Sequence, residues 1–333
     1  MKKNLLMVDY NPKKDWDFLR ALEKTTGEEW MILSHDSTYG HGSMIKKLTR
    51  YADYFYMPFR IFLFKDRYKQ VLAWQQFYGL ILAFYFSLFH IKRFPEITVM
   101  TFIYKPKAGC IGKLYEKFVQ KCVSSDYVQK IIVFSEKEKN YYADIFAVRK
   151  EKFECVALGI EDRTAEIPIE EPQAYYIAPG RSNRDYTFLY NAWNFDTELK
   201  IICEAFPEPR KADNINVISD CYGENYIKLL AGCRAVIVPL KDVHVSSAQL
   251  CILQAMMYGK PVIVTENDSV YDYIINGEDG VIIKKDKDAL AHALVQVEQD
   301  YKAMSKYARK HYLEKFSLYS EGMAIGNMIK SRI

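Results

Sequence analysis

Hydrophobic and polar positions alternate regularly along the second half of the chain. Six short apolar runs, rich in valine and isoleucine, have the length of buried strands, at residues 174–178, 199–203, 215–219, 234–238, 261–265 and 280–283. The segments between them carry helical periodicity, most clearly at residues 225–231, 248–258, 271–275 and 287–298. Strands and helices that alternate with short links predict a parallel sheet covered by helices on both faces.

The first half of the chain contains the same kinds of element in a less regular order. Apolar runs predict strands at residues 4–9, 30–34, 97–102 and 130–134, and helices are predicted at residues 16–23 and 111–123. Either Asp15 or Asp17 is the expected cap of the first helix. Another helix is predicted after Ser135, which has Glu138 three positions later in the arrangement of a capping box.

Residues 71–90 predict one long apolar helix. Its longest apolar run, residues 77–89, is interrupted only by Gly79 and Ser87, and it is shorter than the roughly 20 residues that span a bilayer. The helix is therefore expected either to be buried or to form an interfacial face that rests on lipid. The second interpretation uses the nearby cations Lys65, Arg67, Lys69, Lys92 and Arg93.

The length and composition of the chain fit two folded domains. It has 333 residues, half of them apolar, which is enough for two well-buried cores. A polar, proline-containing stretch at residues 160–173 is the expected linker. We therefore place domains at residues 1–160 and 161–315. A C-terminal helix at residues 316–333 is expected to pack back toward the first domain.

Cysteine usage and the N-terminal pattern indicate the cytosol. The seven cysteines show no Cys-x-x-Cys spacing and most lie in apolar runs, as expected of reduced, buried thiols. The first apolar stretch, before Asp9, has only four apolar residues, too few for a secretory signal.

Charge is unevenly distributed along the chain. Residues 1–160 contain 26 Lys and Arg against 17 Asp and Glu, a net charge of +9, whereas the other residues contain 20 against 25, or −5. A basic first half indicates either an anionic partner, such as a membrane surface or a lipid phosphate, or a solvated lysine-rich surface. Nucleic-acid binding has only this diffuse charge in its favour.

Two segments of the second half carry candidate binding chemistry. Residues 246–264 form a small-residue loop that opens an apolar helix, and such a loop presents backbone N–H groups to an anion. Residues 178–186 follow a strand and place Arg181 and Arg184 beside Gly180. Arginine is suited to gripping phosphate oxygens. Together the two segments predict a pocket for a nucleotide diphosphate.

The blocks around these segments resemble one known family. Gly180, Arg181 and Arg184, followed by LLAGCRAVIVPL, LCILQAMMYGKPVIV and DYIINGEDGVII, occur in the order and spacing of retaining GT-B glycosyltransferases of the group 1 (family 4-like) type, which act in bacterial polysaccharide assembly. The resemblance covers residues 130–333. It implies an α/β GT-B architecture in which two Rossmann-like domains face each other across a cleft, the first holding the acceptor and the second the nucleotide sugar.

The resemblance also implies roles for individual residues. Arg181 and Arg184 would contact the donor diphosphate and stabilise the charge that develops on the leaving group. The alternative is a surface arginine pair bound to carboxylates such as Asp185. His244 is expected near the sugar or the phosphates. The residues expected to bind the donor are Gly180, Ser246, Ser247, Ala248, Gln249 and Gln254.

One departure from the family pattern concerns two glutamates. Such enzymes have a glutamate that touches sugar hydroxyls and, eight positions later, a second that grips the nucleotide ribose. Here Ser246 and Gln254 occupy these positions. The Gln254 amide can still hydrogen-bond a ribose diol, because it both donates and accepts. The alternative is an ordinary glutamine on a helix surface.

Acceptor and metal candidates rest on weaker patterns. His41 lies in a glycine-flanked loop, and Tyr104, Lys105 and Lys107 follow a mid-domain strand, where they would meet an acceptor phosphate or form a solvated basic loop. Asp-x-Asp sequences occur at residues 15–17 and 286–288, where helix capping explains them better than metal binding. We therefore expect no metal and no cofactor, only a nucleotide-sugar co-substrate.

The predicted function is transfer of a hexosyl-type sugar with retention of configuration, in cell-surface polysaccharide synthesis. The donor is a nucleotide-diphosphate sugar, UDP- in preference to GDP-linked, and the acceptor is a glycan or a lipid-linked saccharide. The resemblance implies front-face attack by the acceptor hydroxyl, which depends on positioning. The alternatives are a non-catalytic sugar-nucleotide-binding or partner subunit and a sugar-nucleotide epimerase. A dehydrogenase is disfavoured because no GxGxxG follows the first strand. We expect a cytoplasmic protein, peripheral at the inner face of the plasma membrane.

Overall fold

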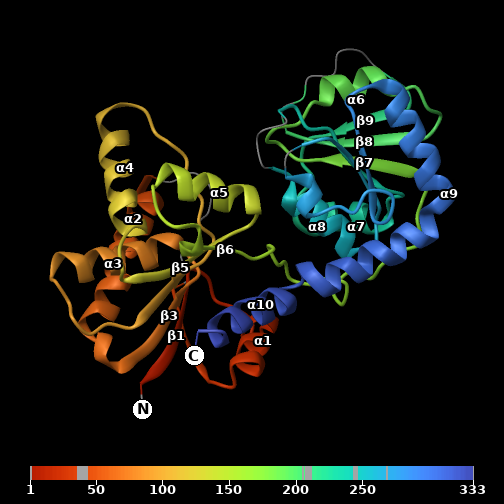
Figure 1. The fold of residues 1–333 in the computed structure, drawn as a ribbon. Helices are drawn as coiled ribbons and strands as arrows, with labels where there is room; N and C mark the ends of the chain where they lie inside the picture. Colours follow the sequence, from red (N-terminus) through yellow and green to blue (C-terminus); the bar gives the residue numbers. More distant parts are fainter. Residues whose placement is uncertain are drawn as a thin grey trace. The chain divides into compact units, whose positions relative to one another are not determined.

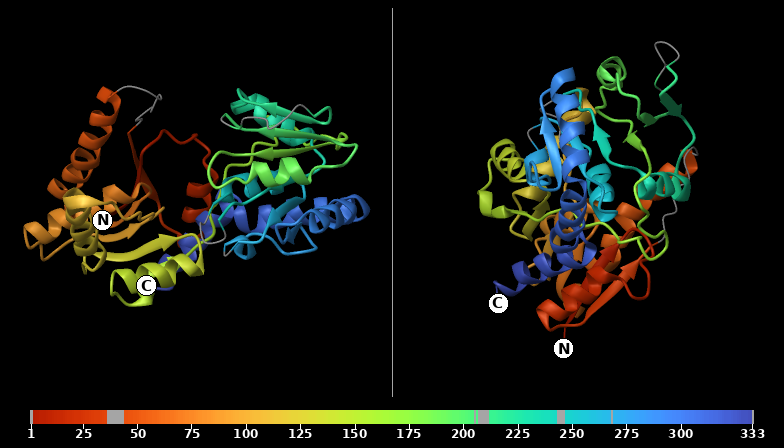
Figure 2. Two further views of the ribbon diagram at one scale, coloured as in Figure 1. Left: turned by 90° about the horizontal axis from the view of Figure 1, so that it is seen from above. Right: turned by 90° about the vertical axis from the view of Figure 1, so that its right-hand side faces the viewer.

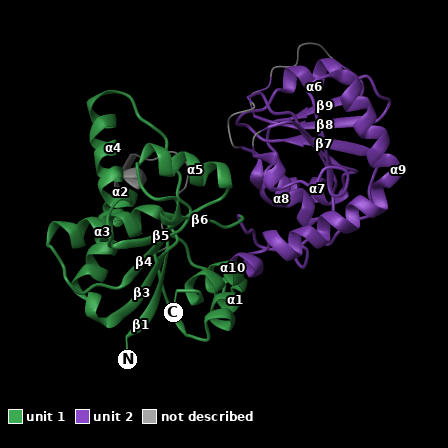
Figure 3. Cartoon of the chain, in the orientation of Figure 1, with its two compact units in different colours: residues 1–157, 322–333 green, residues 158–321 purple. Residues whose placement is uncertain are grey.

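The computed structural model of the chain divides into two compact units. It describes residues 2–35, 44–204, 206, 212–242, 247–267 and 269–332. Unit 1 comprises residues 1–157 and 322–333, and unit 2 comprises residues 158–321 (Figure 3). Each unit has its own parallel sheet and its own apolar core.

Unit 1 is built on a six-stranded parallel sheet with the order β2-β1-β3-β4-β5-β6. Its strands are β1 (Lys3–Val8), β2 (Trp30–Ser34), β3 (Tyr68–Ala73), β4 (Glu96–Val99), β5 (Val128–Val133) and β6 (Phe153–Cys155). Leu5, Leu6 and Met7 in β1, an interior strand between β2 and β3, are all fully buried. Successive residues point to opposite faces, so both faces of this sheet are covered.

The helices of unit 1 are α1 (Asp17–Thr26), α2 (Met44–Leu63), α3 (Gln76–Leu88), α4 (Gly109–Val123) and α5 (Glu136–Ile145), with 3-10 turns η1 (Lys65–Arg67) and η2 (Lys150–Lys152) (Figure 1). The prediction of one helix over residues 71–90 is wrong at its start. Val71, Leu72 and Ala73 belong to β3, which pairs with both β1 and β4. Strand and helix are both buried and apolar, so hydrophobicity alone does not mark the boundary between them.

Of the two predicted helix caps, one is confirmed by the structure and the other is wrong. The Ser135 hydroxyl accepts a hydrogen bond from the Glu138 N–H at 3.1 Å and caps α5, as predicted. The N-cap of α1 is Trp16, without a side-chain hydrogen bond, so the prediction of Asp15 or Asp17 is wrong. Asp17 lies in the first turn instead, where its negative charge interacts favourably with the positive end of the helix dipole.

Unit 2 is built on a second six-stranded parallel sheet, with the order β12-β11-β10-β7-β8-β9. Its strands are β7 (Tyr175–Pro179), β8 (Glu198–Ile202), β9 (Ile215–Ile218), β10 (Val236–Val238), β11 (Val262–Thr265) and β12 (Gly280–Ile283). All six strands predicted in this half are therefore confirmed. Their valine and isoleucine side chains fit a pleated surface that is buried on both faces.

The helices of unit 2 are α6 (Tyr186–Ala192), α7 (Gly223–Gly232), α8 (Gln249–Met257), α9 (Lys287–His311) and the start of α10 (Leu318–Lys330), with the 3-10 turn η3 (Val270–Asp272) and the π-helical turn η4 (Tyr312–Phe316). The helix predicted at 271–275 is wrong, because only η3 forms there. The α9 helix continues well beyond its predicted end at residue 298. Figure 2 shows it as the long blue helix beside the second sheet.

The last helix, α10, passes from unit 2 into unit 1 at Gly322. Within unit 1 its glycines lie against α1: a Cβ atom on Gly322 would stand 2.4 Å from the Phe18 carbonyl oxygen, and one on Gly326 would stand 2.7 Å from the Thr25 Cβ. The small residues therefore permit close packing of the two helices.

Two further observations concern the cysteines and the hydrophobicity of the helices. All seven cysteines are free thiols, and four of them are buried. No helix within the described residues has both the length and the apolar character needed to cross a membrane.

Candidate functional site

The carboxyl ends of β7 and β10 mark a topological switch point in unit 2. From β7 the chain moves outward to β8 and β9, then returns to β10 on the other side of β7. The loops that follow β7 and β10 therefore leave the sheet in opposite directions, and the gap between them is where open α/β sheets bind ligands. The segments that the sequence analysis selected, around Gly180 and before α8, are these two loops.

Asn183 ties the two loops together. Its side-chain amide donates to the Asp242 carbonyl and to the Ser247 hydroxyl, each at 3.0 Å, and its side-chain oxygen accepts from the Asp242 N–H at 2.8 Å. Asn183 adopts a left-handed conformation, with φ of 56°, which asparagine tolerates better than most residues. Local sequence patterns do not indicate this role of Asn183, because its partners lie about 60 residues away.

Gly180 makes room for the Arg184 side chain. It has φ of 121°, and a Cβ atom there would stand 2.7 to 2.9 Å from three atoms of the Arg184 guanidinium. Arg184 folds back over the glycine and donates to the carbonyls of Pro179 at 3.1 Å and Ser182 at 2.8 Å. A third contact reaches the Cys251 Sγ on α8 at 3.4 Å. Arg184 is therefore a fixed cation that joins the β7 loop to α8.

Arg181 is oriented differently from Arg184. Its side chain is 64% exposed and its Nη1 lies 3.2 Å from the Glu204 carboxylate, which follows β8. The Tyr222 hydroxyl, beyond β9, donates to the other oxygen of the same carboxylate. Asp185, the carboxylate considered for this pair, instead caps α6 through the Phe188 N–H at 3.0 Å. Arg181 is thus an accessible cation held by one exposed ion pair.

The N-terminus of α8 has the features of an anion site. Its N-cap is Ala248, with φ of 78° and no side-chain cap. Backbone N–H groups in the first turn of a helix lack intrahelical partners, and the helix dipole favours negative charge there. The Ser247 hydroxyl lies beside this turn, held by Asn183. Gln249 is the first residue of the helix.

Gln254 faces α7. The Tyr226 hydroxyl donates to the Gln254 side-chain oxygen at 3.2 Å, and both residues are half-buried. Burial raises the pKa of Tyr226, and the nearby Arg184 guanidinium lowers it only in part. The tyrosine therefore stays protonated and donates. Gln254 is consequently part of a polar cluster with Tyr226, which the sequence analysis did not select.

The remaining candidates divide into three groups. His41, His244 and Ser246 lie outside the described residues. Tyr104 is only 7% exposed and stacks on Tyr115 at 5.7 Å in the core of unit 1, and its acceptor contact stays a prediction. Lys105 and Lys107 are exposed, and the Lys107 ammonium lies 4.4 Å from the centre of the Tyr115 ring.

The two Asp-x-Asp sequences lie at helix starts. Asp286 caps α9 by accepting from the Ala289 N–H at 2.9 Å, as predicted. Asp17 pairs with Arg20 at 2.7 Å. Among the described residues, no three His, Cys, Asp or Glu side chains gather in a way that could hold a metal ion.

Comparison with known proteins shows what the second half of the chain and its fold are similar to. Residues 194–300 match the family model described as "Glycosyl transferases group 1". A comparison with curated proteins finds no match. The residues of the match include β8 to β12 and α8, whereas the β7 loop with Arg181 and Arg184 lies outside it.

Solved structures match along the whole chain. One is Anabaena Alr3699/HepE in complex with UDP, at 10% identity and a TM-score of 0.64, covering 98% of this chain and 100% of that one. Another is sucrose-phosphate synthase from Thermosynechococcus elongatus, at 13% identity and a TM-score of 0.62, covering 100% and 99%. A third is WaaG, a glycosyltransferase involved in lipopolysaccharide biosynthesis, at 15% identity and a TM-score of 0.56, covering 98% and 99%. The chain has the GT-B fold, and within it residues 194–300 match the group 1 glycosyl transferase model.

Proposed function

We propose that the protein transfers a hexosyl-type sugar from a nucleotide-diphosphate donor, UDP- in preference to GDP-linked, with retention of anomeric configuration. The observation that carries the proposal is the arrangement at the switch point of the group 1 unit. There Arg184, Arg181 and the start of α8 gather at one edge of the sheet. This combination of two cations and a helix N-terminus suits a diphosphate.

Each part of the site has a distinct task in the proposal. The donor diphosphate lies at the uncapped start of α8, and Arg181 turns from Glu204 to a phosphate oxygen. Arg184, which is already fixed by the carbonyls of Pro179 and Ser182, keeps its charge directed at the same place. Fixed cations need little reorganisation as charge develops on the leaving diphosphate, and they lower the barrier for that reason.

The nucleoside end of the donor is assigned to Gln254. Its amide group donates to a ribose hydroxyl, while its oxygen continues to accept from Tyr226. A neutral amide makes weaker hydrogen bonds than a carboxylate does. The ribose contact therefore contributes less to donor affinity than it would with a glutamate at this position. The diphosphate contacts then contribute a larger share of that affinity.

The acceptor is proposed to be a glycan or a lipid-linked saccharide in cell-surface polysaccharide synthesis. WaaG, which shares the fold, is involved in lipopolysaccharide biosynthesis. The basic first half of the chain, with a net charge of +9 over residues 1–160 (26 Lys and Arg minus 17 Asp and Glu), supports an acceptor or membrane that carries phosphate. We place the protein in the cytoplasm, peripheral at the inner face of the plasma membrane, and without a metal requirement.

A non-catalytic sugar-nucleotide-binding subunit is the second candidate. The observation that favours it is the absence of a carboxylate at both positions 246 and 254. The geometry of Arg184 and Gly180 argues for retained donor binding in either case. The two candidates therefore differ in turnover and not in nucleotide affinity.

Donor binding and hydrolysis separate these possibilities. We expect UDP-glucose to raise the melting temperature, because a ligand at 100 times its Kd stabilises the folded state by about 2.7 kcal/mol. Arg181→Ala should weaken binding about tenfold, the effect of one exposed charge-assisted hydrogen bond. The matched control is Arg163→Ala, which breaks a similar exposed pair, Arg163–Glu166, near the other end of α8.

The outcomes of this experiment are distinct. Binding together with slow donor hydrolysis that is lost in Arg181→Ala supports the transferase. Binding without turnover on any lipid-linked acceptor supports the subunit. Absence of stabilisation by every UDP- and GDP-sugar at millimolar concentration would contradict both.

A further inference from the structure

Helix α2 has two apolar faces, and only one of them belongs to the core of unit 1. Tyr54, Met57 and Ile61 are 9%, 1% and 2% exposed and pack in that core. Their spacing of three and four residues is that of a helix stripe facing inward. A surface helix of a globular protein normally carries polar residues on its opposite side.

The outward side of α2 is also apolar. Tyr51, Phe55, Phe59 and Leu63 recur every fourth residue and are between 42% and 55% exposed. Contacts between rings extend this side to the end of α3, since Phe62 lies 6.0 Å from Phe59 and 5.0 Å from Phe89. Together with Tyr56, Phe64 and Leu88, which are also exposed, these residues form what we term the α2 face.

Cations border the aromatic rings of the α2 face. Arg60 lies 5.8 Å from the ring centre of Tyr56, Lys65 lies 5.7 Å from that of Phe62, and Arg67 lies 4.5 Å from that of Phe64. Residues 44–67 contain six Lys or Arg and two Asp or Glu, a net charge of +4. The face is therefore apolar at its centre, and the cations Arg60, Lys65 and Arg67 lie beside its rings.

We propose that the α2 face rests on an anionic phospholipid surface. Aromatic and aliphatic side chains enter the boundary between headgroups and acyl chains, and Lys and Arg beside them attract anionic headgroups. A protein partner is the alternative occupant, because a protein interface also has an apolar core and a polar rim. The net charge of +4 over residues 44–67, with few carboxylates, favours a continuous anionic surface instead.

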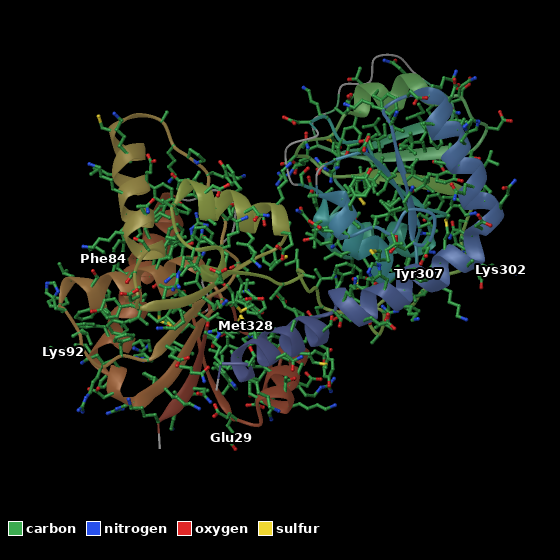
Figure 4. All side chains as sticks on the ribbon, viewed as in Figure 1. Glu29, Phe84, Lys92, Lys302, Tyr307 and Met328 are labelled. Atoms are coloured by element: carbon green, nitrogen blue, oxygen red, sulfur yellow. The ribbon has the colours of Figure 1, made fainter. Side chains whose placement is uncertain are left out.

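The exposed apolar face lies on α2 and not along residues 71–90, where the sequence predicted an interfacial face. Most of α3 is buried, including Tyr78, Leu82 and Phe86, so the interfacial face predicted over residues 71–90 is confined to its last residues. Lys69 pairs with Glu28 at 2.5 Å, away from α2. Lys92, labelled in Figure 4, follows α3 at the outer edge of unit 1. Figure 2 shows α2 along one side of the same unit.

The proposal deepens the peripheral location given above and is tested without any sugar nucleotide, so that its failure leaves the donor site unaffected. The full chain is sedimented with vesicles of phosphatidylcholine alone or mixed with phosphatidylglycerol, at low and high salt. We expect binding to the mixed vesicles, weakened by salt because the attraction is screened. Phosphatidylcholine vesicles should bind far more weakly.

Two variants separate the apolar and the electrostatic contributions. Arg60→Gln with Arg67→Gln should weaken binding roughly 25-fold, because each cation near an anionic surface contributes about fivefold. Phe55→Ser with Leu63→Ser should weaken it about tenfold or more by removing inserted apolar area. The matched control is Ile111→Ser with Leu114→Ser on α4, whose side chains are 78% and 69% exposed.

The results that would overturn the proposal are specific. Equal losses in the α4 control would show that general surface hydrophobicity drives binding. Absence of binding to phosphatidylglycerol vesicles by the folded wild-type chain would contradict it directly. Self-association through the α2 face, seen as a concentration-dependent mass that Phe55→Ser with Leu63→Ser abolishes, would assign the face to a second copy of the chain instead. Melting curves establish that each variant is folded.

Discussion

The buried carboxyl group of Glu321 predicts how the stability of the protein changes with pH. Its side chain lies at the start of α10, is only 1% exposed and packs against Gly159, where an added Cβ would stand 2.8 Å from the carboxylate. Burial raises the pKa of Glu321 from its ordinary value of 4.5 to about 8, against a smaller lowering by the nearby Gly159 backbone. The folded protein therefore holds this carboxyl group protonated at neutral pH.

The consequence for stability has a definite sign. Between the unfolded pKa of 4.5 and the folded pKa of about 8, the folded state binds a proton that the unfolded state has released. Stability must then fall as pH rises through this window. At 1.36 kcal/mol per pH unit the loss is about 5 kcal/mol, from a pKa difference of 3.5 between those two values.

The perturbation is Glu321→Gln, which keeps the shape and the acceptor oxygen but does not ionise. We expect the variant to be similar in stability to the wild type at pH 5 and several kcal/mol more stable at pH 8.5, measured by urea unfolding across that range. Glu314→Gln is the matched control, because Glu314 is exposed and forms only an i,i+4 pair with Lys310 at 3.8 Å. A difference between Glu321→Gln and the wild type that does not change with pH would refute the reasoning.

Two further predictions concern the switch-point site. Gly180→Ala should destabilise the protein by about 1–3 kcal/mol and weaken UDP binding, because it strains the backbone and displaces Arg184. In urea unfolding and UDP titration the control is Gly277→Ala, at φ of 87° with only Gln296 within 4 Å; an equal effect on UDP binding would exclude a role for Arg184. Gln254→Glu should tighten UDP binding about fivefold in calorimetry, since a charged acceptor strengthens the ribose hydrogen bond, and unchanged affinity would place the ribose elsewhere.

Much of the fold follows from local pattern. The six strands of unit 2 are runs of valine and isoleucine bounded by turn residues, so they are identified from sequence almost to the residue. The same reasoning fails at residues 71–76, where a buried strand passes into a buried helix and the boundary is marked by Gln75, which caps α3 but is not among the residues that usually cap helices. It fails again at Trp16, because which residue begins a helix depends on packing as well as on capping chemistry.

The candidate site was predicted in outline and not in detail. The sequence predicted that Arg181 and Arg184 lie in the loop after β7. It did not indicate that Arg184 folds over Gly180 or that Arg181 pairs with Glu204. Tyr226 was missed because its contact with Gln254 joins two helices that are separated by a strand. Such contacts depend on how the helices pack, which a single sequence does not encode locally.

Hydrogen–deuterium exchange with and without UDP tests the central claim most directly. If the donor diphosphate binds at the switch point of unit 2, exchange should slow in the β7 loop, at residues 180–185, and in the first turn of α8. The loops after β1 and β3 of unit 1 should be unaffected. Protection confined to unit 1, or no protection anywhere at saturating UDP, would contradict the account.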